Sequence, residues 1–382
     1  MAFLYEADLE DYLMEELGDL GFRLMHGAQT VPDIEDSLRA TWHDAVLTPV
    51  LLEALARINP TIPERVLVEA SKRVLDSVFT TDLVQENRRL HRLFVEGIKV
   101  EYVEAGEDRN AVVRLVDWED DHNDWRAVNQ FDIVGKTPRI PDVVLFLNGL
   151  PLVVIELKGT EGKNIEAAYN QIETYKTDIP DLFRTGLLNV ISDGHLARYG
   201  SLCADLDRFM TWRTIDGETL VANGSDLALE TLTRGLLNRE ALLELLRWFV
   251  VFEDEGRGPI KKVAGYHQFF AVRKAVEAIQ QARGRDGKAG VIWHTQGSGK
   301  SLLMTFLAGR VMHHPGLENP TLLMLTDRND LDNQLFATFG RCKDRLVAPR
   351  ECSREDADCR QENLAAPRLS AGSDDGRRQD HP

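Results

Sequence analysis

The sequence has few cysteines, no long apolar run and no aromatic residue near its C-terminal end. Three of the four cysteines, Cys342, Cys352 and Cys359, lie close together without the paired spacing of a zinc site. No apolar run approaches the roughly 18 residues of a membrane span. The N-terminus turns acidic at once and lacks the basic start of a signal peptide. These absences predict a cytoplasmic protein that has no contact with a membrane.

Positive charge is also scarce, because the 382 residues carry a formal net charge of −17. Non-specific affinity for nucleic acid depends on Lys and Arg that neutralise phosphates, so the balance argues against a general nucleic-acid coat. It does not exclude a nuclease. Arg88, Arg89 and Arg92 would share a helix and provide local basic surface, although they are equally consistent with a solvated helix face.

The last residues, 341–382, differ from everything before them. They contain no Phe, Trp or Tyr and no apolar periodicity, and they carry a dense scatter of Arg, Asp, Ser and Pro. We expect this tail not to pack. Either a non-native continuation, as from a shifted reading frame, or a disordered end fits its composition.

Three charged residues, Asp142, Glu156 and Lys158, stand in two otherwise apolar runs between Pro141 and Lys158. Continuous Val, Leu, Ile and Phe predicts strands buried on both faces. Burial of an unpaired carboxylate there costs roughly several kcal/mol of folding free energy, so its charge needs a partner. A divalent metal held by Asp142 and Glu156, with Lys158 nearby, is one solution, and it is typical of a metal-dependent nuclease. The simpler alternative is a strand start at Asp142 and an edge ion pair between Glu156 and Lys158.

The turn between these strands decides whether the carboxylates meet. Asn148-Gly149 is a hairpin signal. A two-residue loop would set Asp142 opposite Ile155 and turn Glu156 to the other face. A three-residue loop, which includes Leu150, sets Asp142 opposite Glu156, so we expect the three-residue form with Gly149 or its neighbour in the left-handed conformation.

The next predicted helix runs from Asn164 to Lys176 and carries Gln171 and Tyr175 on one face. A Gln amide and a phenol there can contact phosphates or bases. Together, D…ExK followed by QxxxY resembles the nuclease core of the PD-(D/E)xK superfamily in its RecB-like branch. The resemblance implies catalytic roles for both carboxylates, for Lys158, Gln171 and Tyr175, and Mg²⁺ as the metal.

A second motif lies downstream. Val291–His294 is predicted to be a strand, followed by a glycine loop and a helix from Leu302 to Val311. The loop is Thr295, Gln296, Gly297, Ser298, Gly299, Lys300 and Ser301. Strand, GSGKS and helix is the context of a phosphate cradle, in which Lys300 opposes phosphate charge and Ser301 offers a hydroxyl to Mg²⁺. It matches the looser helicase pattern, because His294 stands where the strict pattern has Gly; a glycine turn without nucleotide is the alternative.

Two flanking segments agree with an ATP-driven motor. Gln268 opens a helix and resembles the glutamine motif with which superfamily 2 helicases read adenine, although a solvated Gln is also compatible. Thr321–Arg328 is predicted to be a buried strand ending in polar residues, followed by a helix from Leu331 to Phe339. Thr326 and Arg328 would then lie at the ligand crevice and touch DNA, with a plain strand-end turn as the alternative.

A nuclease core followed by such an ATPase resembles the restriction (R) subunit of type I restriction-modification enzymes. Shorter stretches support the likeness, among them Asn87–Phe94, Val128–Phe131, Ser192–Gly194 and Trp212–Gly217. The resemblance implies cleavage and translocation of double-stranded DNA that depend on ATP and Mg²⁺, in a complex with specificity and methyltransferase subunits.

We therefore predict an α/β protein in which residues 1–255 form a PD-(D/E)xK endonuclease domain, 256–260 a linker, and 261–340 the first part of a RecA-like superfamily 2 helicase domain. The Gly- and Pro-rich linker follows a helix predicted over Leu236–Val251. No acidic Walker B motif follows the phosphate loop, so we expect no ATP turnover. The alternatives are a catalytically idle nucleotide- or partner-binding remnant, or a helicase-nuclease of another defence or repair family.

Overall fold

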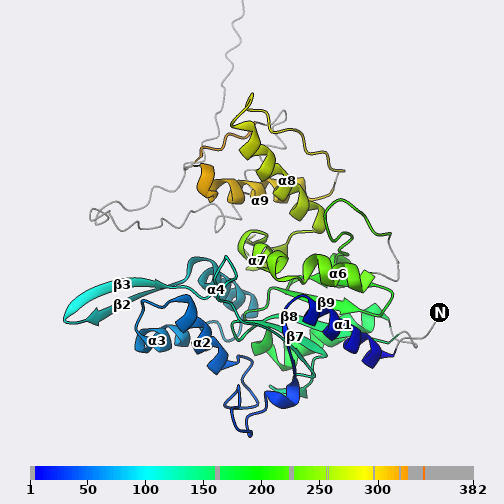
Figure 1. Ribbon diagram of the computed structural model, residues 1–382. Coiled ribbons are helices and arrows are strands. Elements are labelled where there is room, and N and C mark those ends of the chain that lie inside the picture. The colour runs from blue at the N-terminus through cyan, green and yellow to red at the C-terminus, as the bar shows by residue number, and fades with distance from the viewer. Residues whose placement is uncertain are drawn as a thin grey trace, which may run out of the picture.

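The computed structural model describes residues 5–159, 164–222, 228–254, 256, 258–295, 297–317, 320–325 and 339. It is a mixed α/β structure (Figure 1). Its helices are α1 (Glu6–Asp19), α2 (Thr48–Ile58), α3 (Glu64–Leu75), α4 (Leu83–Glu96), α5 (Ile165–Asp178), α6 (Ala228–Leu236), α7 (Arg239–Trp248), α8 (Tyr266–Ala282) and α9 (Lys300–Met312), with short 3-10 turns η1 (Gly27–Gln29), η2 (Pro180–Phe183), η3 (Leu206–Arg208) and η4 (Pro315–Leu317).

The main sheet has six strands in the order β1-β4-β7-β8-β9-β10. Its strands are β1 (Arg23–His26), β4 (Trp125–Asn129), β7 (Val143–Leu147), β8 (Leu150–Leu157), β9 (Leu188–Ser192) and β10 (Ala197–Gly200). Three two-stranded ribbons pair β2 (Ile98–Glu104) with β3 (Glu107–Val113), β5 (Ile133–Val134) with β6 (Pro138–Arg139), and β11 (Val250–Asp254) with β12 (Pro259–Val263). Every residue of β7 and β8 is buried, as their apolar composition predicts.

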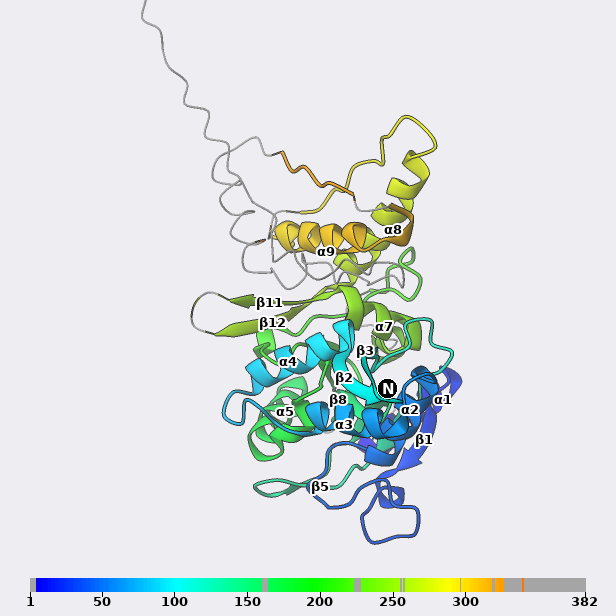
Figure 2. The ribbon, with the colours of Figure 1, turned by 90° about the vertical axis from the view of Figure 1, so that its left-hand side faces the viewer.

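The two faces of the sheet have separate apolar cores. Leu145 and Ile155 belong to the larger core, which includes α1, whereas Val144 and Val154 belong to the smaller one, which includes α5. Figure 2 shows α5 and α1 on either side of β8. Because side chains alternate along a strand, Asp142 and Glu156 project to the α5 side.

The turn between β7 and β8 differs from the prediction, but the register of the strands does not. Asn148 and Gly149 form a two-residue turn with φ of 53° and 78°, not the expected three-residue loop. Leu147 accordingly faces Leu150. The register then shifts by one residue, and Val143 faces Ile155. A bulge at Leu152, inside β8, thus supplies the extra residue that we assigned to the loop.

The N-terminal part of the chain carries three separate helices after β1. Helices α2, α3 and α4 follow one another with loops between them. The apolar segment from Val128 to Val134 is divided between two strands. Strand β4 ends at Asn129, Gln130 takes a left-handed φ of 53°, and β5 begins at Ile133.

The predicted linker is the turn of a hairpin. Strand β11 begins at Val250, inside the helix predicted to reach Val251, and pairs antiparallel with β12 from Asp254–Pro259 onward. Residues 256 and 258 lie in the turn. A charged, Gly-rich hairpin turn has the composition of a linker, so the sequence could not distinguish the two. The domain limits at 255 and 261 stay predictions.

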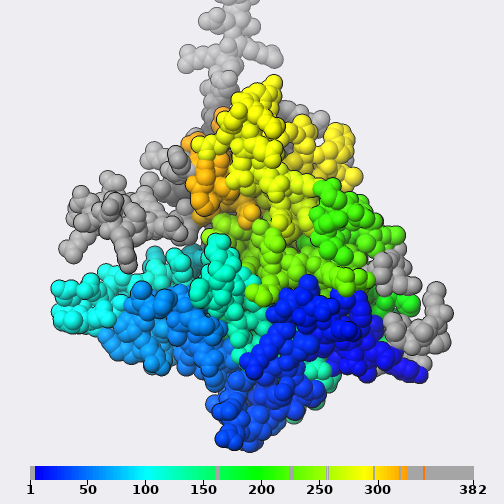
Figure 3. Space-filling view, viewed as in Figure 1, coloured from blue at the N-terminus to red at the C-terminus, as the bar shows by residue number. Residues whose placement is uncertain are grey.

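Helices α8 and α9 pack on the elements before them. Phe249, just after α7, lies 4.8 Å from Phe269 of α8 and 5.6 Å from Phe306 of α9, measured between ring centroids. Figure 3 shows the yellow α8 region standing on the green part of the surface. Both helices share one apolar cluster with the face of the main sheet.

Two predicted strands are not formed. Residues 291–295 and 320–325 have no regular structure, and Val291, Trp293, Leu323 and Leu325 are each more than four-fifths exposed. Neither segment pairs with another strand within the described ranges, and an unpaired strand leaves its backbone groups without partners. The helix predicted over Leu331–Phe339 and the tail 341–382 lie outside the described residues, apart from residue 339. No described helix is both long and apolar enough to cross a membrane.

Candidate functional site

The two carboxylates of the nuclease motif meet across β7 and β8. The pairing of Val143 with Ile155 places Asp142 across from Glu156. Asp142 accepts a hydrogen bond from the backbone N–H of Leu157 through Oδ2, at 2.7 Å. Glu156 is 1% exposed and Asp142 is 7% exposed. The structure therefore brings these predicted metal-binding residues together.

Lys158 completes the group from the end of β8. Its Nζ lies 2.5 Å from Oε1 of Glu156 and also donates to the carbonyl of Leu157, at 2.7 Å. A third partner comes from α1, where Oε1 of Glu6 is 3.4 Å away. The predicted lysine thus shares the site with both carboxylates.

Burial dominates the electrostatics of this group. The pKa of Asp142 is raised to about 6, mainly by burial, with smaller contributions from the charges of Glu6 and Glu10, while the Leu157 N–H and Lys158 act against the rise. Burial and the neighbouring Asp142 raise the pKa of Glu156 to about 8. Burial opposes the charge on Lys158, but Glu156, Asp142 and Glu6 outweigh it and raise the pKa of the ammonium.

A divalent cation fits this arrangement. Oε2 of Glu156 is buried and has no hydrogen-bond partner. An orphaned carboxylate oxygen beside a second carboxylate is what a hard cation would neutralise. Within the described ranges no three His, Cys, Asp or Glu side chains cluster closely enough to hold an ion, so Asp142 and Glu156 form a two-carboxylate site.

The predicted residue pair on α5, Gln171 and Tyr175, lies beside the carboxylates, but the phenol of Tyr175 is not open to a ligand. Asn164 caps α5 by accepting from the N–H of Ala167. The hydroxyl of Tyr175 donates to the carbonyl of Ile140, and the amide of Gln171 donates to that hydroxyl, both at 3.1 Å. Tyr175 is 1% exposed, and burial together with the charge of Glu156 raises its pKa.

Sequence reasoning missed two residues of this site, Glu6 and Glu10. Glu6 reaches Lys158, and Glu10 holds Asn129 and Gln130 at the end of β4. Both come from α1, more than a hundred positions from the motif. Their spacing of four residues puts them on one helix face, which is the one signal the sequence carries.

The glycine loop before α9 is folded onto itself. Nζ of Lys300 donates to the carbonyls of His294 and Thr295, at 3.2 and 2.9 Å. Gly297 and Gly299 have φ of 82° and 75°, conformations that favour glycine. Ser298 bonds to the carbonyl of Thr295, and Ser301 lies in the first turn of α9. Gln296 lies outside the described residues, as do Thr326 and Arg328.

Gln268 touches this loop, but the chain itself uses both ends of its amide. Oε1 accepts from the N–H of Gly265 at 2.9 Å, and Nε2 donates to the carbonyl of Gly299 at 3.1 Å. The neighbouring His267 lies 3.1 Å from the carbonyl of Ser298, measured from Nε2. The glutamine thus lies beside the glycine loop, where it caps α8 and holds the loop.

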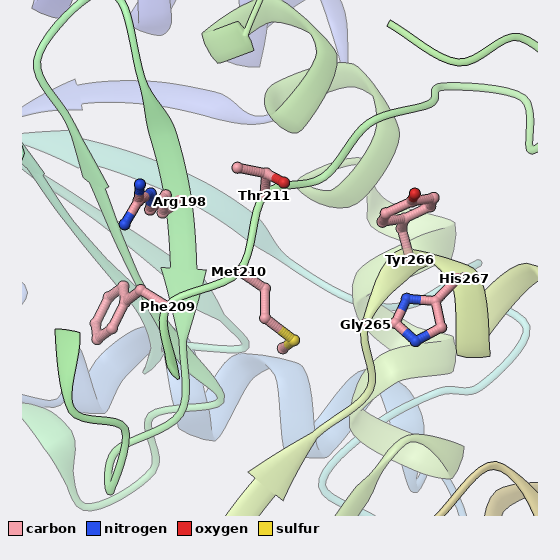
Figure 4. A pocket seen from close by; sticks show the side chains of 7 residues that line it. All are labelled: Arg198, Phe209, Met210, Thr211, Gly265, Tyr266 and His267. Atoms are coloured by element: carbon pink, nitrogen blue, oxygen red, sulfur yellow. The ribbon is translucent and has the colours of Figure 1, made fainter. Parts of the chain in front are cut away.

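A pocket opens beside His267 (Figure 4). One wall comes from β10 and the segment after η3, and the other from the start of α8. Its lining residues are Arg198, Phe209, Met210, Thr211, Gly265, Tyr266 and His267. The pocket therefore lies between the edge of the main sheet and the helix that contacts the glycine loop.

The arginines of α4 are engaged in internal contacts. Arg89 pairs with Glu86 at 2.5 Å and donates to the carbonyl of Arg73. Arg88 lies 3.8 Å from Asp254 of β11. These ion pairs favour a structural role for both side chains.

Comparisons with known proteins find a family match for each of two parts of the chain. Residues 3–208 match the family described as "Type I restriction enzyme R protein N terminus", and residues 267–363 match "SWI2/SNF2 ATPase". The second match continues into the residues predicted to be a tail.

Two relatives extend these matches. The chain is 40% identical over 371 residues to the "Type I restriction enzyme HindI endonuclease subunit" of Haemophilus influenzae, covering 95% of this chain and 35% of the relative. It is 30% identical over 362 residues to the "Putative type I restriction enzyme MjaIXP endonuclease subunit" of Methanocaldococcus jannaschii, covering 86% and 34%. The chain spans about a third of the length of these relatives. With more than half of its residues matched by the family model, it belongs to the family of type I restriction enzyme R protein N termini.

Proposed function

We propose that this chain is the nuclease-bearing part of a type I restriction (R) subunit and that it cleaves double-stranded DNA at Asp142, Glu156 and Lys158. The observation that carries the proposal is the buried, orphaned oxygen of Glu156 beside Asp142. Two buried acids with raised pKa values, one of them 2.5 Å from a lysine, are an unfavourable cluster in a stable core. Such clusters are typical of reaction sites.

Asp142 and Glu156 would hold one or two Mg²⁺ ions, and the PD-(D/E)xK fold of the RecB-like branch is part of this proposal. Bound Mg²⁺ supplies positive charge to the attacked phosphate and activates water. Lys158 would stabilise the developing negative charge or orient the water. Tyr175 and Gln171 fix the Ile140 backbone two residues before Asp142, so they position the carboxylate in this structure.

The segment from Gln268 to Ser301 would bind the nucleotide of a RecA-like superfamily 2 motor. Lys300 must leave the carbonyls of His294 and Thr295 before it can reach a phosphate. Gly297 to Ser301 would then cradle the phosphates of ATP, with Mg²⁺ at the Ser301 hydroxyl. The match to an ATPase family from residue 267 supports this assignment.

The wider reaction follows from the family. Relatives named as endonuclease subunits of type I restriction enzymes support double-stranded DNA as substrate. They also support specificity and methyltransferase subunits as partners, ATP-driven translocation in the intact subunit, and a cytoplasmic location. Family membership favours this function over an idle remnant or another defence nuclease.

Nicking of supercoiled DNA by residues 1–382 in Mg²⁺ tests the proposal. Asp142→Ala and Lys158→Ala should each abolish nicking while the melting temperature stays close to that of the wild type. Glu16→Ala is a matched control, because Glu16 is a buried glutamate of α1 that pairs with Arg234 instead of the site. Unchanged nicking by either site variant would refute the assignment.

A further inference from the structure

A buried carboxylate on α1 holds the end of β4. Oε1 of Glu10 accepts from the amide of Asn129 at 2.7 Å, and Oε2 accepts from the amide of Gln130 at 2.6 Å. Glu10 is only 9% exposed. Hydrogen bonds to an ionised carboxylate are stronger than neutral ones, so Glu10 fixes the orientation of both amides.

Gln130 is in a backbone conformation that its side chain disfavours. Its φ of 53° lies in the left-handed region, where a residue with a Cβ is strained. Strain of this kind persists only where the surroundings enforce it, and it concentrates at functional sites. Gly27 packs against the same peptide so closely that a Cβ there would lie 1.9 Å from the Gln130 carbonyl oxygen.

Gln130 is hydrogen-bonded directly to Asp142 of the proposed nuclease site. The N–H of Gln130 donates to the carbonyl of Asp142 at 2.8 Å. On the other side, the Asp142 carboxylate accepts from the N–H of Leu157. Asp142 is therefore fixed between two neighbouring strands, and Gln130 provides one of the two attachments.

Glu10 is not arranged as a third ligand. Both of its oxygens are used by the amides, and within the described part of the chain it does not join Asp142 and Glu156 in a cluster that could hold an ion. Its charge acts on Asp142 directly, whereas its hydrogen bonds would act on a metal through Gln130. Partners that orient metal-binding groups in this way control affinity.

We propose that Glu10 is a positioning residue for the divalent metal of the nuclease site and that it acts on Asp142 through Gln130 and Asn129. This inference rests on the proposed nuclease function. It adds α1, which the sequence motif does not include, to the machinery that holds the metal.

The affinity of the complete chain for Mn²⁺, measured from the electron paramagnetic resonance signal of free and bound ion, tests this role. Glu10→Ala should weaken binding by about tenfold. Glu10→Gln should be intermediate, because its carbonyl oxygen can accept one of the two amide bonds. Glu16→Ala, which breaks the other buried carboxylate contact of α1, should bind as the wild type does.

The substitution Glu10→Ala, made in a chain that lacks both amides, distinguishes a positioning role of Glu10 from direct binding of the ion by Glu10. In a chain with Asn129→Ala and Gln130→Ala, the further change Glu10→Ala should have little additional effect. An equal loss of affinity in both backgrounds would show that Glu10 acts on the ion itself and would overturn the proposal.

Relief of backbone strain provides a further comparison. Gln130→Gly accepts the positive φ but removes the amide, so it should weaken Mn²⁺ binding as Glu10→Ala does. Asp36→Gly is its matched control, since Asp36 has a φ of 59° at an exposed position. Asp36→Gly should leave the affinity unchanged. Wild-type affinity in Gln130→Gly would contradict the proposed path.

Asp142→Ala distinguishes failure of the proposed metal site from failure of the positioning role of Glu10. If it binds Mn²⁺ as tightly as the wild type, the metal site of the proposed function is wrong. If it loses the ion while Glu10→Ala retains wild-type affinity, the nuclease site stands and the positioning role is overturned. Circular dichroism of each variant shows whether it is folded.

Discussion

Glu156 and Lys158, two residues apart at the end of β8, form a buried ion pair with 2.5 Å between Oε1 and Nζ. The pair leaves the second oxygen of Glu156 without a partner. A pair that served only stability would satisfy both oxygens, because an unsatisfied buried acceptor is costly. The geometry therefore favours a site that is completed by a cation.

The first prediction concerns the stability of the metal-free protein against pH. Folding raises the pKa of Asp142 to about 6 and of Glu156 to about 8, above their ordinary values. At these two carboxyl groups the folded state then binds more protons than the unfolded state, and their contribution to the free energy of unfolding falls as pH rises from about 4 to about 8. Chemical denaturation at a series of pH values, with a chelator present, measures this slope.

Asp142→Asn and Glu156→Gln supply the control for that experiment. Each removes one acid with a raised pKa, so each should flatten the decline. Added Mg²⁺ should restore stability to the wild type near pH 8 but not to the variants. A pH dependence that is the same in the wild type and in both variants would contradict the raised pKa values of the two acids.

Part of this site was predictable and part was not. The residues and their shared face followed from the apolar runs around Asp142 and Glu156 and from the alternation of strand side chains. The bulge at Leu152 was not predictable, because a bulge and a longer loop add the same single residue. Glu6 and Glu10 were missed because their approach to the site depends on how α1 packs, and no local pattern encodes that contact.

The absence of a local sequence pattern also explains why the hairpin of β11 and β12 was predicted as a linker. Its turn carries the Gly and charged residues that also mark linkers, and the antiparallel pairing of β11 with β12 is what distinguishes a hairpin from a linker. Conversely, α5, α8 and α9 were predictable, because each begins after a recognisable capping or glycine signal and carries apolar residues at helical spacing.

The second prediction concerns Lys261, a lysine of β12 that is 2% exposed. Its ammonium donates to Oδ1 of Asn87 and to the carbonyl of Gly186, at 2.9 and 2.6 Å. Burial lowers its pKa to about 7. The unfolded state thus binds more protons between about pH 7 and 10, and this residue makes stability rise with pH over that interval.

Lys261→Met tests this contribution with a side chain of similar length. The difference in free energy of unfolding between wild type and Lys261→Met should grow in favour of the wild type from pH 7 to pH 10. Lys262→Met is the matched control, because Lys262 is half-exposed and paired with Glu253. A difference that is constant with pH would show that Lys261 stays charged in the fold.

The third prediction concerns nucleotide turnover. Residues 291–295 and 320–325 form no strands, and Lys300 is bound to loop carbonyls. Hydrolysis by motors of this type also requires an acid that holds Mg²⁺ and a second lobe, each worth orders of magnitude in rate. We expect residues 1–382 to show no DNA-stimulated ATPase activity above that of Lys300→Ala. Robust turnover that Lys300→Ala abolishes would contradict this.

The last prediction concerns how α8 and α9 are attached. Limited proteolysis should cut at the turn of the β11–β12 hairpin, where Gly256 is exposed. Because β12 pairs with β11 and Phe306 packs on Phe249, the two pieces should stay together in gel filtration and separate only on a denaturing gel. Phe306→Ala, which removes about 3 to 5 kcal/mol of core packing, should allow the nicked pieces to dissociate. Separation of the nicked wild type under native conditions would show that the predicted linker at 256–260 divides two independent domains after all.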